Sequence, residues 1–338
     1  MRAAEVKSER SARPPSSASP GVEAPSDAAF ERIGGFPGAV FVRGVPKAAQ
    51  ITVDATFVCA LTQGGEEWCW RDDDASPIDG EPPVGRRPSL VPSEGALRDI
   101  SGPCRLGSRI DCFGSRGMEQ QIADATALSK DGAGCAVLRD GRVACWYEPS
   151  PWDDVLVAGE VPAIRGAREV SLGRFGACAI EDQGHLVCWG AASLIPWEPG
   201  SGGWTPPPAT GPTLLRGIDD VAHVSLRDGF HCLVRKTGKV LCWFPEDAAT
   251  VLPQNPLPPG AEVRGIEDAV AIFGKLVIDG HGALRALTLE FDARGQLDVV
   301  AVPVGSGVLG DVVAADGSLE RGCAVLRDGG IACWAQPQ

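Results

Sequence analysis

Cysteine is the residue of this chain whose number and spacing could do chemistry. The chain holds twelve cysteines, which fall into six neighbouring pairs along the sequence. Two thiols held side by side can be oxidised to a disulfide, whereas isolated core thiols pack as small apolar side chains. Five pairs are ten residues apart and one pair is eight residues apart. The pairs are Cys59 and Cys69, Cys104 and Cys112, Cys135 and Cys145, Cys178 and Cys188, Cys232 and Cys242, and Cys323 and Cys333.

Each pair belongs to a sequence unit that predicts a β-hairpin. The clearest copies are 134–146, GCAVLRDGRVACW, and 322–334, GCAVLRDGGIACW. Their apolar arms suit a pleated, buried surface, and Asp-Gly supplies turn chemistry between them. A two-residue turn would pair Cys135 with Trp146, whereas a three-residue loop ending in a left-handed glycine would place the two cysteines opposite each other. The other ten-residue pairs favour the second register, because each has a glycine at the same loop position: Gly65, Gly184, Gly238 and Gly329.

A seventh copy of the unit, at 276–287, supports bonded cysteines. It keeps the loop glycine, Gly282, but has Leu276 and Ala286 where a pair would stand, so both cysteines are absent together. We therefore expect six disulfides, each worth at most about 2–3 kcal/mol in the chain-entropy model. Reduced, buried thiols are the alternative. A zinc site is not expected, because the spacing is C-x9-C and the four histidines do not cluster.

Paired cysteines in this number indicate an oxidising, extracytoplasmic compartment: the periplasm, the cell surface or the secreted space. Residues 1–35 conflict with that inference. They are rich in Ser, Pro, Ala and charge, which predicts a disordered tail or linker, and they hold no apolar core of a signal peptide. A misplaced start codon is the explanation we favour; another export route or reduced cysteines are the alternatives.

The net charge of −13 argues against nonspecific binding to nucleic acid or to an anionic membrane surface. No apolar run approaches the length of a membrane span, so we expect no membrane insertion.

Internal repetition dominates residues 36–338. The first cysteine of each unit, or its equivalent, recurs seven times at steps of 31–54 residues. A second pattern precedes most of these marks, as in RGIDDVAHVS at 216–225 and RGIEDAVAI at 264–272. Each unit thus offers about four short strands: a V-R-G-I strand, a D-V-x-x-V-S strand and two hairpin arms. Seven such units predict an all-β, seven-bladed β-propeller of four-stranded blades.

The two ends of the repeat region are complementary. The last unit stops shortly after Trp334 and lacks a V-R-G-I strand, while GAVFVRGV at 38–45 resembles GAEVRGI at 260–266. We therefore expect the N-terminal strand to complete the last blade and to remove an open sheet edge. A stacked β-solenoid is the runner-up, and it predicts no complementary ends.

The hairpins resemble the regulator-of-chromosome-condensation repeat in its bacterial, cysteine-containing form. The resemblance covers about 36–338 and is carried by CAVLRDGRVACW at 135–146, CAI and VCWG at 178–180 and 187–190, HCLV at 231–234, and 323–334. It implies a seven-bladed propeller. The Gly/Asn-rich segment that usually follows the tryptophan is missing: RDDD follows Trp70 and YEPS follows Trp146. The family's roles, nucleotide exchange on a small GTPase, chromatin docking and β-lactamase inhibition, have no motif residues here to carry them over.

One rim of the expected propeller is the candidate interface. The long, Pro-rich connections 71–92, 147–163, 190–213, 244–261 and 288–303 all leave the same ends of the blades. Variable loops on a rigid scaffold commonly serve recognition, and tryptophan is favoured at interface hot spots. The candidate interface residues are Trp152, Trp197 and Trp204; alternatively, each folds back over a blade edge. The tryptophans that follow the second cysteine are expected between blades, with Phe113 and Leu287 in their place in two units.

Nothing in the sequence predicts catalysis, a cofactor or a metal. No nucleophile elbow, phosphate-binding loop or histidine-based metal motif is present. The acidic cluster of Asp72, Asp73, Asp74, Asp79 and Glu81 has no calcium-loop spacing, so a solvated loop is expected there. We therefore expect a monomeric, non-enzymatic scaffold that binds another protein. The alternatives are a hydrolase or lyase at the channel mouth and, by family analogy, guanine-nucleotide exchange.

Overall fold

The computed structural model describes residues 29–54, 56–71, 87–112, 122, 124–131, 133–147, 157–173, 176–190, 211–227, 231–243, 262–291, 297–307 and 309–335. Strands dominate these stretches, and the one short helix among them is the 3-10 turn η3 (Val304–Gly307). No helix in this part of the chain is long and apolar enough to cross a membrane.

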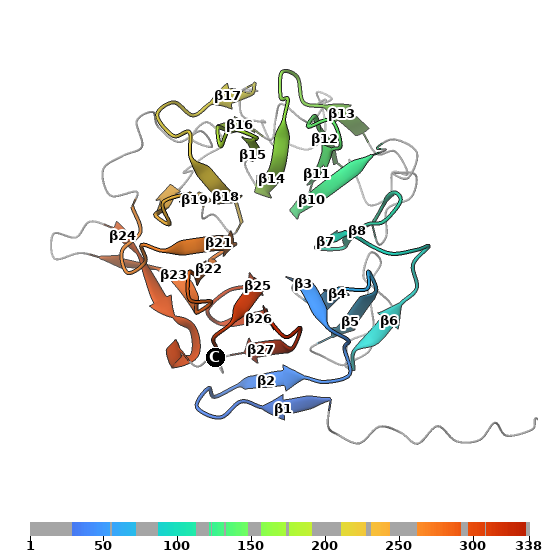
Figure 1. Cartoon of the computed structure of the whole chain (residues 1–338), viewed down its shortest axis with the longest axis vertical. Helices are drawn as coiled ribbons and strands as arrows, with labels where there is room; N and C mark the ends of the chain where they lie inside the picture. The colour runs from blue at the N-terminus through green and yellow to red at the C-terminus, as the bar shows by residue number, and fades with distance from the viewer. Residues whose placement is uncertain are drawn as a thin grey trace, which may run out of the picture.

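Seven antiparallel sheets stand radially around a central channel, which confirms the predicted seven-bladed β-propeller (Figure 1). Blade 1 contains β3 (Ala48–Val53), β4 (Phe57–Thr62), β5 (Glu67–Arg71) and β6 (Ser89–Val91). Blade 2 contains β7 (Asp99–Ser101), β8 (Cys104–Leu106) and β9 (Ile110–Cys112). Blade 3 contains β10 (Ala125–Asp131), β11 (Ala133–Leu138), β12 (Val143–Tyr147) and β13 (Val157–Glu160).

The remaining blades follow the same plan. Blade 4 contains β14 (Ala167–Gly173), β15 (Gly176–Glu181), β16 (Leu186–Gly190) and β17 (Thr213–Leu214). Blade 5 contains β18 (Val221–Ser225), β19 (His231–Arg235) and β20 (Val240–Trp243). Blade 6 contains β21 (Ala269–Phe273), β22 (Leu276–Asp279), β23 (Leu284–Phe291) and β24 (Leu297–Pro303). Blade 7 contains β25 (Val312–Gly317), β26 (Arg321–Leu326) and β27 (Ile331–Ala335), joined by β2 (Ala39–Val42) and β1 (Phe30–Arg32).

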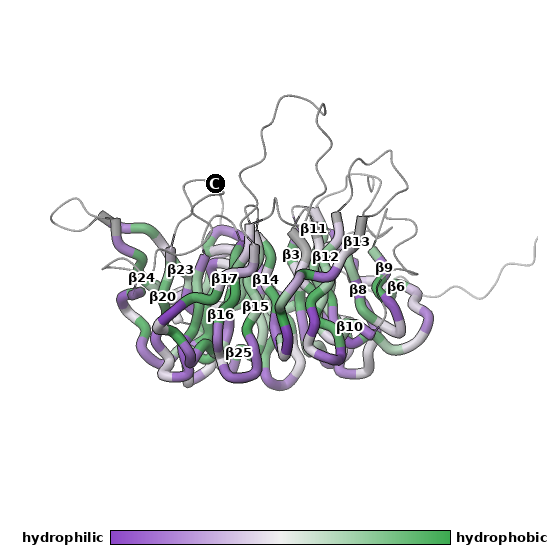
Figure 2. The backbone as a smooth tube through the Cα atoms, turned by 90° about the horizontal axis from the view of Figure 1, so that it is seen from above, coloured by the Kyte–Doolittle hydropathy of each residue, from purple (hydrophilic) through white to green (hydrophobic). Residues whose placement is uncertain are grey.

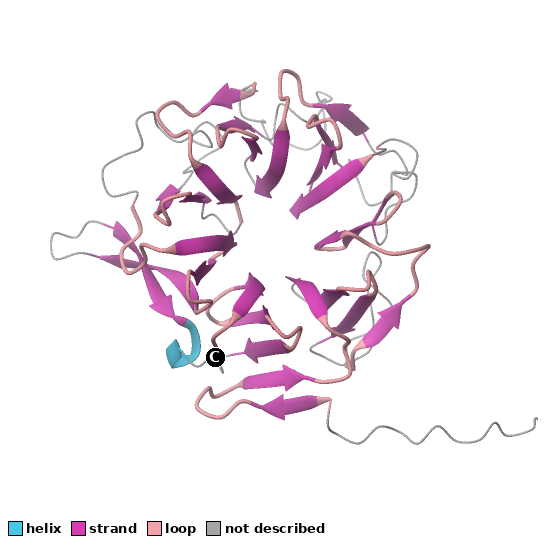
Figure 3. Cartoon of the chain, in the orientation of Figure 1, coloured by secondary structure: helices cyan, strands magenta, loops and turns pink. Residues whose placement is uncertain are grey.

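Each blade begins at the channel and runs outward (Figure 3). The D-V-x-x-V-S segment is the inner strand and the hairpin arms are the second and third strands. Short glycine turns join the arms, so they all lie on one face of the ring, along the lower edge in Figure 2. The third strands end at the opposite face. We call these two faces the turn side and the long-connection rim.

The two ends of the described chain share blade 7. Strand β2 pairs antiparallel with β27, with Val40 opposite Cys333, and β1 adds a fifth strand outside β2. The sheet thus starts at Phe30, inside the segment that the sequence assigns to the tail. Phe36 stacks on Trp334 with ring centroids 6.2 Å apart, which packs this N-terminal segment against the blade.

The V-R-G-I segment is not a strand throughout. In blade 4 the outer strand ends at Leu214, and Arg216-Gly217 forms the turn towards the next inner strand. Gly217 and Gly265 have φ values of +82° and +85°, in the left-handed region that glycine adopts without steric cost. At these two positions glycine follows the outer segment and redirects the chain inward.

The apolar core lies between neighbouring blades. One cluster contains Trp146 of blade 3 together with Leu106 and Ile110 of blade 2, and another contains Trp189 of blade 4 with Val137 of blade 3. The tryptophans after the second cysteine are all at most 4% exposed: Trp70, Trp146, Trp189, Trp243 and Trp334. Leu287 is buried in the same way between blades 5 and 6, as predicted. Phe113 lies outside the described residues.

Candidate functional site

The cysteines form six disulfides with the pairing that the spacing predicts. The Cα atoms of each pair are 4.0 or 4.1 Å apart, and no described cysteine is free. In every case the two cysteines lie directly opposite each other on the second and third strands of a blade. Each bridge therefore staples one hairpin and does not link one blade to the next. The bonds join Cys59 to Cys69, Cys104 to Cys112, Cys135 to Cys145, Cys178 to Cys188, Cys232 to Cys242, and Cys323 to Cys333.

The loop glycine sets this register. In blade 3 the amide of Gly141 donates to the carbonyl of Leu138 and that of Leu138 donates to Arg142, both at 2.8 Å, which closes the three-residue loop. Gly141 has φ +76°, as the left-handed position requires. In blade 6, Leu276 and Ala286 face each other at the position of the disulfide, both fully buried, so apolar packing replaces sulfur there.

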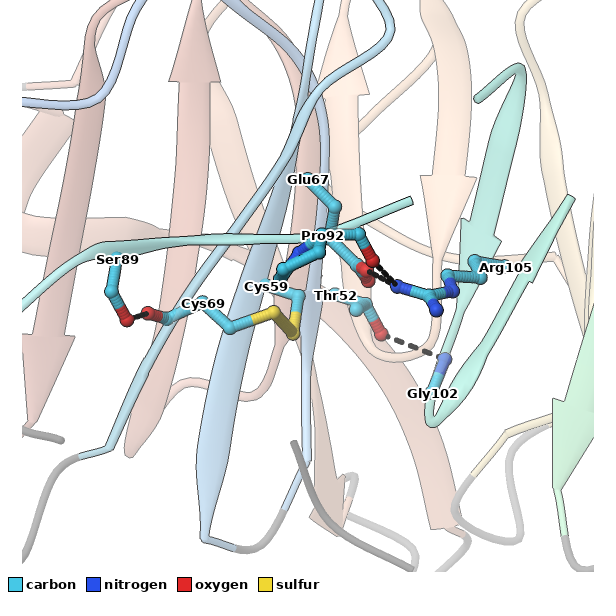
Figure 4. The surroundings of a disulfide bond; sticks show 8 residues. All are labelled: Thr52, Cys59, Glu67, Cys69, Ser89, Pro92, Gly102 and Arg105. Carbon is cyan, nitrogen blue, oxygen red and sulfur yellow. Dashed lines mark hydrogen bonds and ion pairs between the residues drawn. A yellow bond between two sulfur atoms is a disulfide. The ribbon is translucent and has the colours of Figure 1, made fainter. Parts of the chain in front are cut away.

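The first disulfide has charged neighbours (Figure 4). Glu67 lies beside the bond between Cys59 and Cys69, and its buried carboxylate accepts a hydrogen bond from Arg105 of blade 2 at 3.2 Å. Burial raises the pKa of Glu67, while the Arg105 guanidinium opposes that rise. Cys59, Cys69 and Glu67 are close enough together to suggest a metal site, but both sulfurs are already bonded to each other. The cluster therefore joins blades 1 and 2 through an ion pair.

A belt of hydrogen bonds runs around the channel near the long-connection rim. In it, a side chain on one inner strand accepts the backbone N–H of the next inner strand. The last residue of the D-V-x-x-V-S pattern supplies the acceptor: Ser171 accepts from Leu226 at 3.0 Å and Ser225 from Gly274 at 2.8 Å. The further contacts are Thr52 with Gly102, Ser129 with Leu172, and Asp316 with Val53.

A second, shorter belt lies two residues earlier on the same strands, towards the turn side. Gln50 accepts the N–H of Ile100 at 3.3 Å, Asp99 that of Leu128 at 2.8 Å, and Glu169 that of Val224 at 2.9 Å. Inner strands are sheet edges with unpaired amides, so these contacts satisfy backbone groups that the blades themselves leave open.

The channel also holds titratable groups, which bear on the enzyme alternative. Burial raises the pKa of Asp99 to about 6, and the hydrogen bond from the Leu128 backbone N–H opposes the rise. Nδ1 of His223 lies 3.1 Å from Glu169, and Arg227 forms an ion pair with Asp316. A hydrolase or lyase with its site at the channel mouth would need several carboxyl groups of raised pKa at one end of the channel. Asp99 supplies one, and it already serves as an acceptor within the ring.

The predicted interface tryptophans, Trp152, Trp197 and Trp204, lie outside the described residues. The structure does define the strands on either side of the connections in which they lie. Trp152 lies in the connection from β12 to β13, and the other two lie in the connection from β16 to β17, which leave the long-connection rim.

Sequence reasoning missed the belts. The recurring serine at the end of the inner-strand pattern was the sequence signal of the first belt, but the partner of its hydroxyl group is known only when the neighbouring blade is placed.

The fold and the channel together define a seven-bladed β-propeller. No protein-family model matches the chain, and no curated protein matches its sequence. Among solved structures it is similar to the β-propeller domain of Cps50 (Swd1) from Myceliophteria thermophila, with a TM-score of 0.53 and 12% identity over 88% of this chain and 100% of that one. It is also similar to the WD40 β-propeller domain of Doa1, with a TM-score of 0.51 and 14% identity over 90% and 99% of the two chains. Prp20p from Saccharomyces cerevisiae matches with a TM-score of 0.41 and 13% identity over 84% and 70%. Identities this low show a shared fold alone, so the repeat family remains a prediction from sequence.

Proposed function

We propose that the protein is a non-enzymatic scaffold that binds a protein partner through its long-connection rim. The observation that carries the proposal is the contrast between the two faces. On the turn side, hairpin after hairpin closes with the same short glycine loop, whereas the connections on the opposite rim differ in length and sequence. A rigid ring with uniform blades and divergent loops is the usual arrangement of a recognition scaffold.

The composition of that rim suggests the chemistry of the partner. The segments 72–86 and 148–156 together hold eight acidic residues and one arginine, and 191–210 holds Trp197 and Trp204 among prolines. Acidic connections that carry tryptophans suit a partner whose surface combines basic and apolar groups. Association should then weaken as salt is raised.

The experiment uses the immobilised full chain to retain partners from an extract of its natural source. Trp197→Ala with Trp204→Ala should abolish retention and leave the melting temperature nearly unchanged; Trp152→Ala tests the third anchor. Trp189→Ala is the matched control, because removal of this buried side chain should lower the stability by about 3–5 kcal/mol. A loss of stability in the rim variants as large as in the control would show that these tryptophans cover blade edges.

We also propose that the protein works as a monomer in an oxidising, extracytoplasmic compartment. The six disulfides support this location, because such bonds are rare in reducing compartments. Alkylation of protein isolated from its natural source, followed by mass measurement, should detect no free thiol before reduction and twelve after it. Alkylation before reduction would contradict the location.

A further inference from the structure

The inner strands carry a repeated irregularity at the turn-side mouth of the channel. Six of them contain a register shift at the same place, for example between Ala269 and Ala271 in blade 6 and between Val312 and Ala314 in blade 7. Such a bulge inserts one residue and re-aims its side chain. The inserted residues around the mouth are Ala49, Thr126, Arg168, Ala222, Val270 and Val313.

Blades 6 and 7 make one side of this mouth apolar. Val270 is 50% exposed and Val313 is 39% exposed, although both are aliphatic. The next residue on each strand is an alanine, Ala271 or Ala314. The equivalent residues of blades 1, 2, 4 and 5 are polar: Gln50, Asp99, Glu169 and His223. Blade 3 has an alanine there, Ala127, but its inserted residue is the polar Thr126. We call Val270, Ala271, Val313 and Ala314 the mouth patch.

The second hydrogen-bond belt is interrupted at these alanines, as it is at Ala127 of blade 3. Where the belt is complete, a side chain on the preceding blade accepts an inner-strand N–H. The alanine side chain has no hydrogen-bond acceptor. Ala271 therefore cannot accept a hydrogen bond from the N–H of Ala315, and Ala314 cannot accept one from the N–H of Ile51. Ala315 and Ile51 both line the channel cavity of about 320 Å³. These amides can therefore donate to carbonyl oxygens of an incoming ligand.

Acidic side chains border the mouth patch. Asp268 and Asp311 precede the two valines by two residues, and their side chains are 52% and 76% exposed. Their nearest basic side chains lie close to the 4.0 Å limit of an ion pair: His281 is 3.9 Å from Asp268, and Arg327 is 3.7 Å from Asp311. Glu267 is exposed beside Asp268. The chain as a whole carries a charge of −13.

We propose that the mouth patch is a second protein-binding site, which takes a peptide segment with an aliphatic side chain flanked by lysine or arginine. The aliphatic side chain packs on Val270 and Val313. Backbone carbonyl oxygens of the peptide accept the N–H groups of Ala315 and Ile51, and its basic side chains pair with Asp268 and Asp311. Because this site lies on the turn side, it is independent of the long-connection rim, and the ring can hold two partners at once.

Fluorescein-labelled synthetic peptides test the site by anisotropy with the full chain. The first peptide has paired leucines flanked by lysines, the second replaces its lysines with glutamates, and the third replaces its leucines with serines. We expect saturable binding of the first peptide alone, weakened by added salt. Binding of all three, or of none, overturns the proposal.

Variants locate the binding on the protein. Val270→Ser with Val313→Ser should weaken binding of the first peptide by at least about tenfold, and Asp268→Asn with Asp311→Asn should weaken it and reduce its salt dependence. The matched control is Leu90→Ser with Leu214→Ser, because these aliphatic side chains are 50% and 47% exposed on outer strands. The control should bind the peptide as the unmodified protein does.

Three outcomes would overturn the proposal. Equal binding by the mouth-patch variant and the unmodified protein would place the peptide elsewhere. Weaker binding that is fully accounted for by a lowered melting temperature would show that the two valines stabilise the fold and do not contact the peptide. Sedimentation that shows a dimer, lost in the mouth-patch variant, would show that a second copy of the chain covers the patch.

Discussion

His231 is a buried base with an unpartnered ring nitrogen. It precedes the first cysteine of blade 5, where other hairpins have Gly134, Ala177 or Gly322. Its ring meets Trp243 edge-on at 5.7 Å, it is 1% exposed, and its Nδ1 has no hydrogen-bond partner. Burial lowers the pKa of His231 to about 4, because the interblade core disfavours the charged ring.

Acid should therefore destabilise the fold through His231. The unfolded chain takes up this proton near pH 6.5 and the folded chain only near pH 4, so stability is lost as the pH falls through that window. The loss amounts to about 3 kcal/mol at most. The free energy of unfolding of His231→Phe, measured with urea, should rise relative to the unmodified protein by up to about that amount between pH 7 and pH 4. A constant difference would contradict it.

Asp99 opposes His231 in the same pH range and must be separated from it. Its pKa is raised to about 6, so protonation below that value favours the folded state until the unfolded carboxyl group also titrates. The two groups partly cancel in the unmodified protein. Asp99→Asn is the control, because it should steepen the loss of stability with acid, whereas His231→Phe should remove it.

At the scale of the hairpin, sequence determines register. Every ten-residue cysteine pair has a glycine at one loop position, and only the three-residue loop uses its left-handed conformation, so the disulfide pairing could be predicted. The outer strands could not be predicted as well. β17 has two residues and both are exposed, so no buried alternation marks its bounds. Its length depends on pairing with Val187 and Cys188 of the neighbouring strand.

The position of the turn between blades could not be predicted from the sequence either. The sequence aligns Arg165-Gly166 with Arg216-Gly217. The structure instead places Ala163 at the position of Gly217, because both lie eight residues before the belt serines Ser171 and Ser225. Ala163 has φ +68°, a conformation that costs an L-residue about 1–2 kcal/mol.

Opposite substitutions at these two positions should have opposite effects. Ala163→Gly relieves backbone strain but adds freedom to the unfolded chain, so a net gain of about 0.5–1 kcal/mol is expected. Gly217→Ala should lose about the same, because its added Cβ meets nothing within 4 Å and the effect is conformational alone. Urea midpoints at constant m-value measure both changes. Shifts of the same sign in the two variants would refute the alignment.

At the scale of the whole molecule, the channel depends on contacts between blades that are distant in sequence. The belts, the Arg105–Glu67 ion pair and the mouth patch each combine residues of different repeats. A repeat pattern predicts the number of blades. It does not show which residue of a neighbouring blade a side chain contacts, because that depends on how the blades are arranged in the closed ring. For that reason the fold and the disulfides could be predicted, whereas the belts and the mouth patch could not.

Closure of the ring gives the last prediction. β2 covers β27, and the N-terminal segment buries Ile33, Phe36 and Val42. Deleting residues 1–43 removes these contacts and exposes the edge of β27, whereas deleting 1–28 leaves every described contact in place. The longer deletion should lower the free energy of unfolding by about 5 kcal/mol, because three buried side chains contribute about 1.5–3 kcal/mol each and the unfolded chain already buries part of that surface. It should also promote aggregation through the open edge. Urea unfolding and light scattering measure the two effects. Equal stability of the two deletions would show that blade 7 does not need its N-terminal strands.

A synthetic peptide of residues 29–43 should restore stability to the longer deletion, because it can occupy the vacant edge of β27.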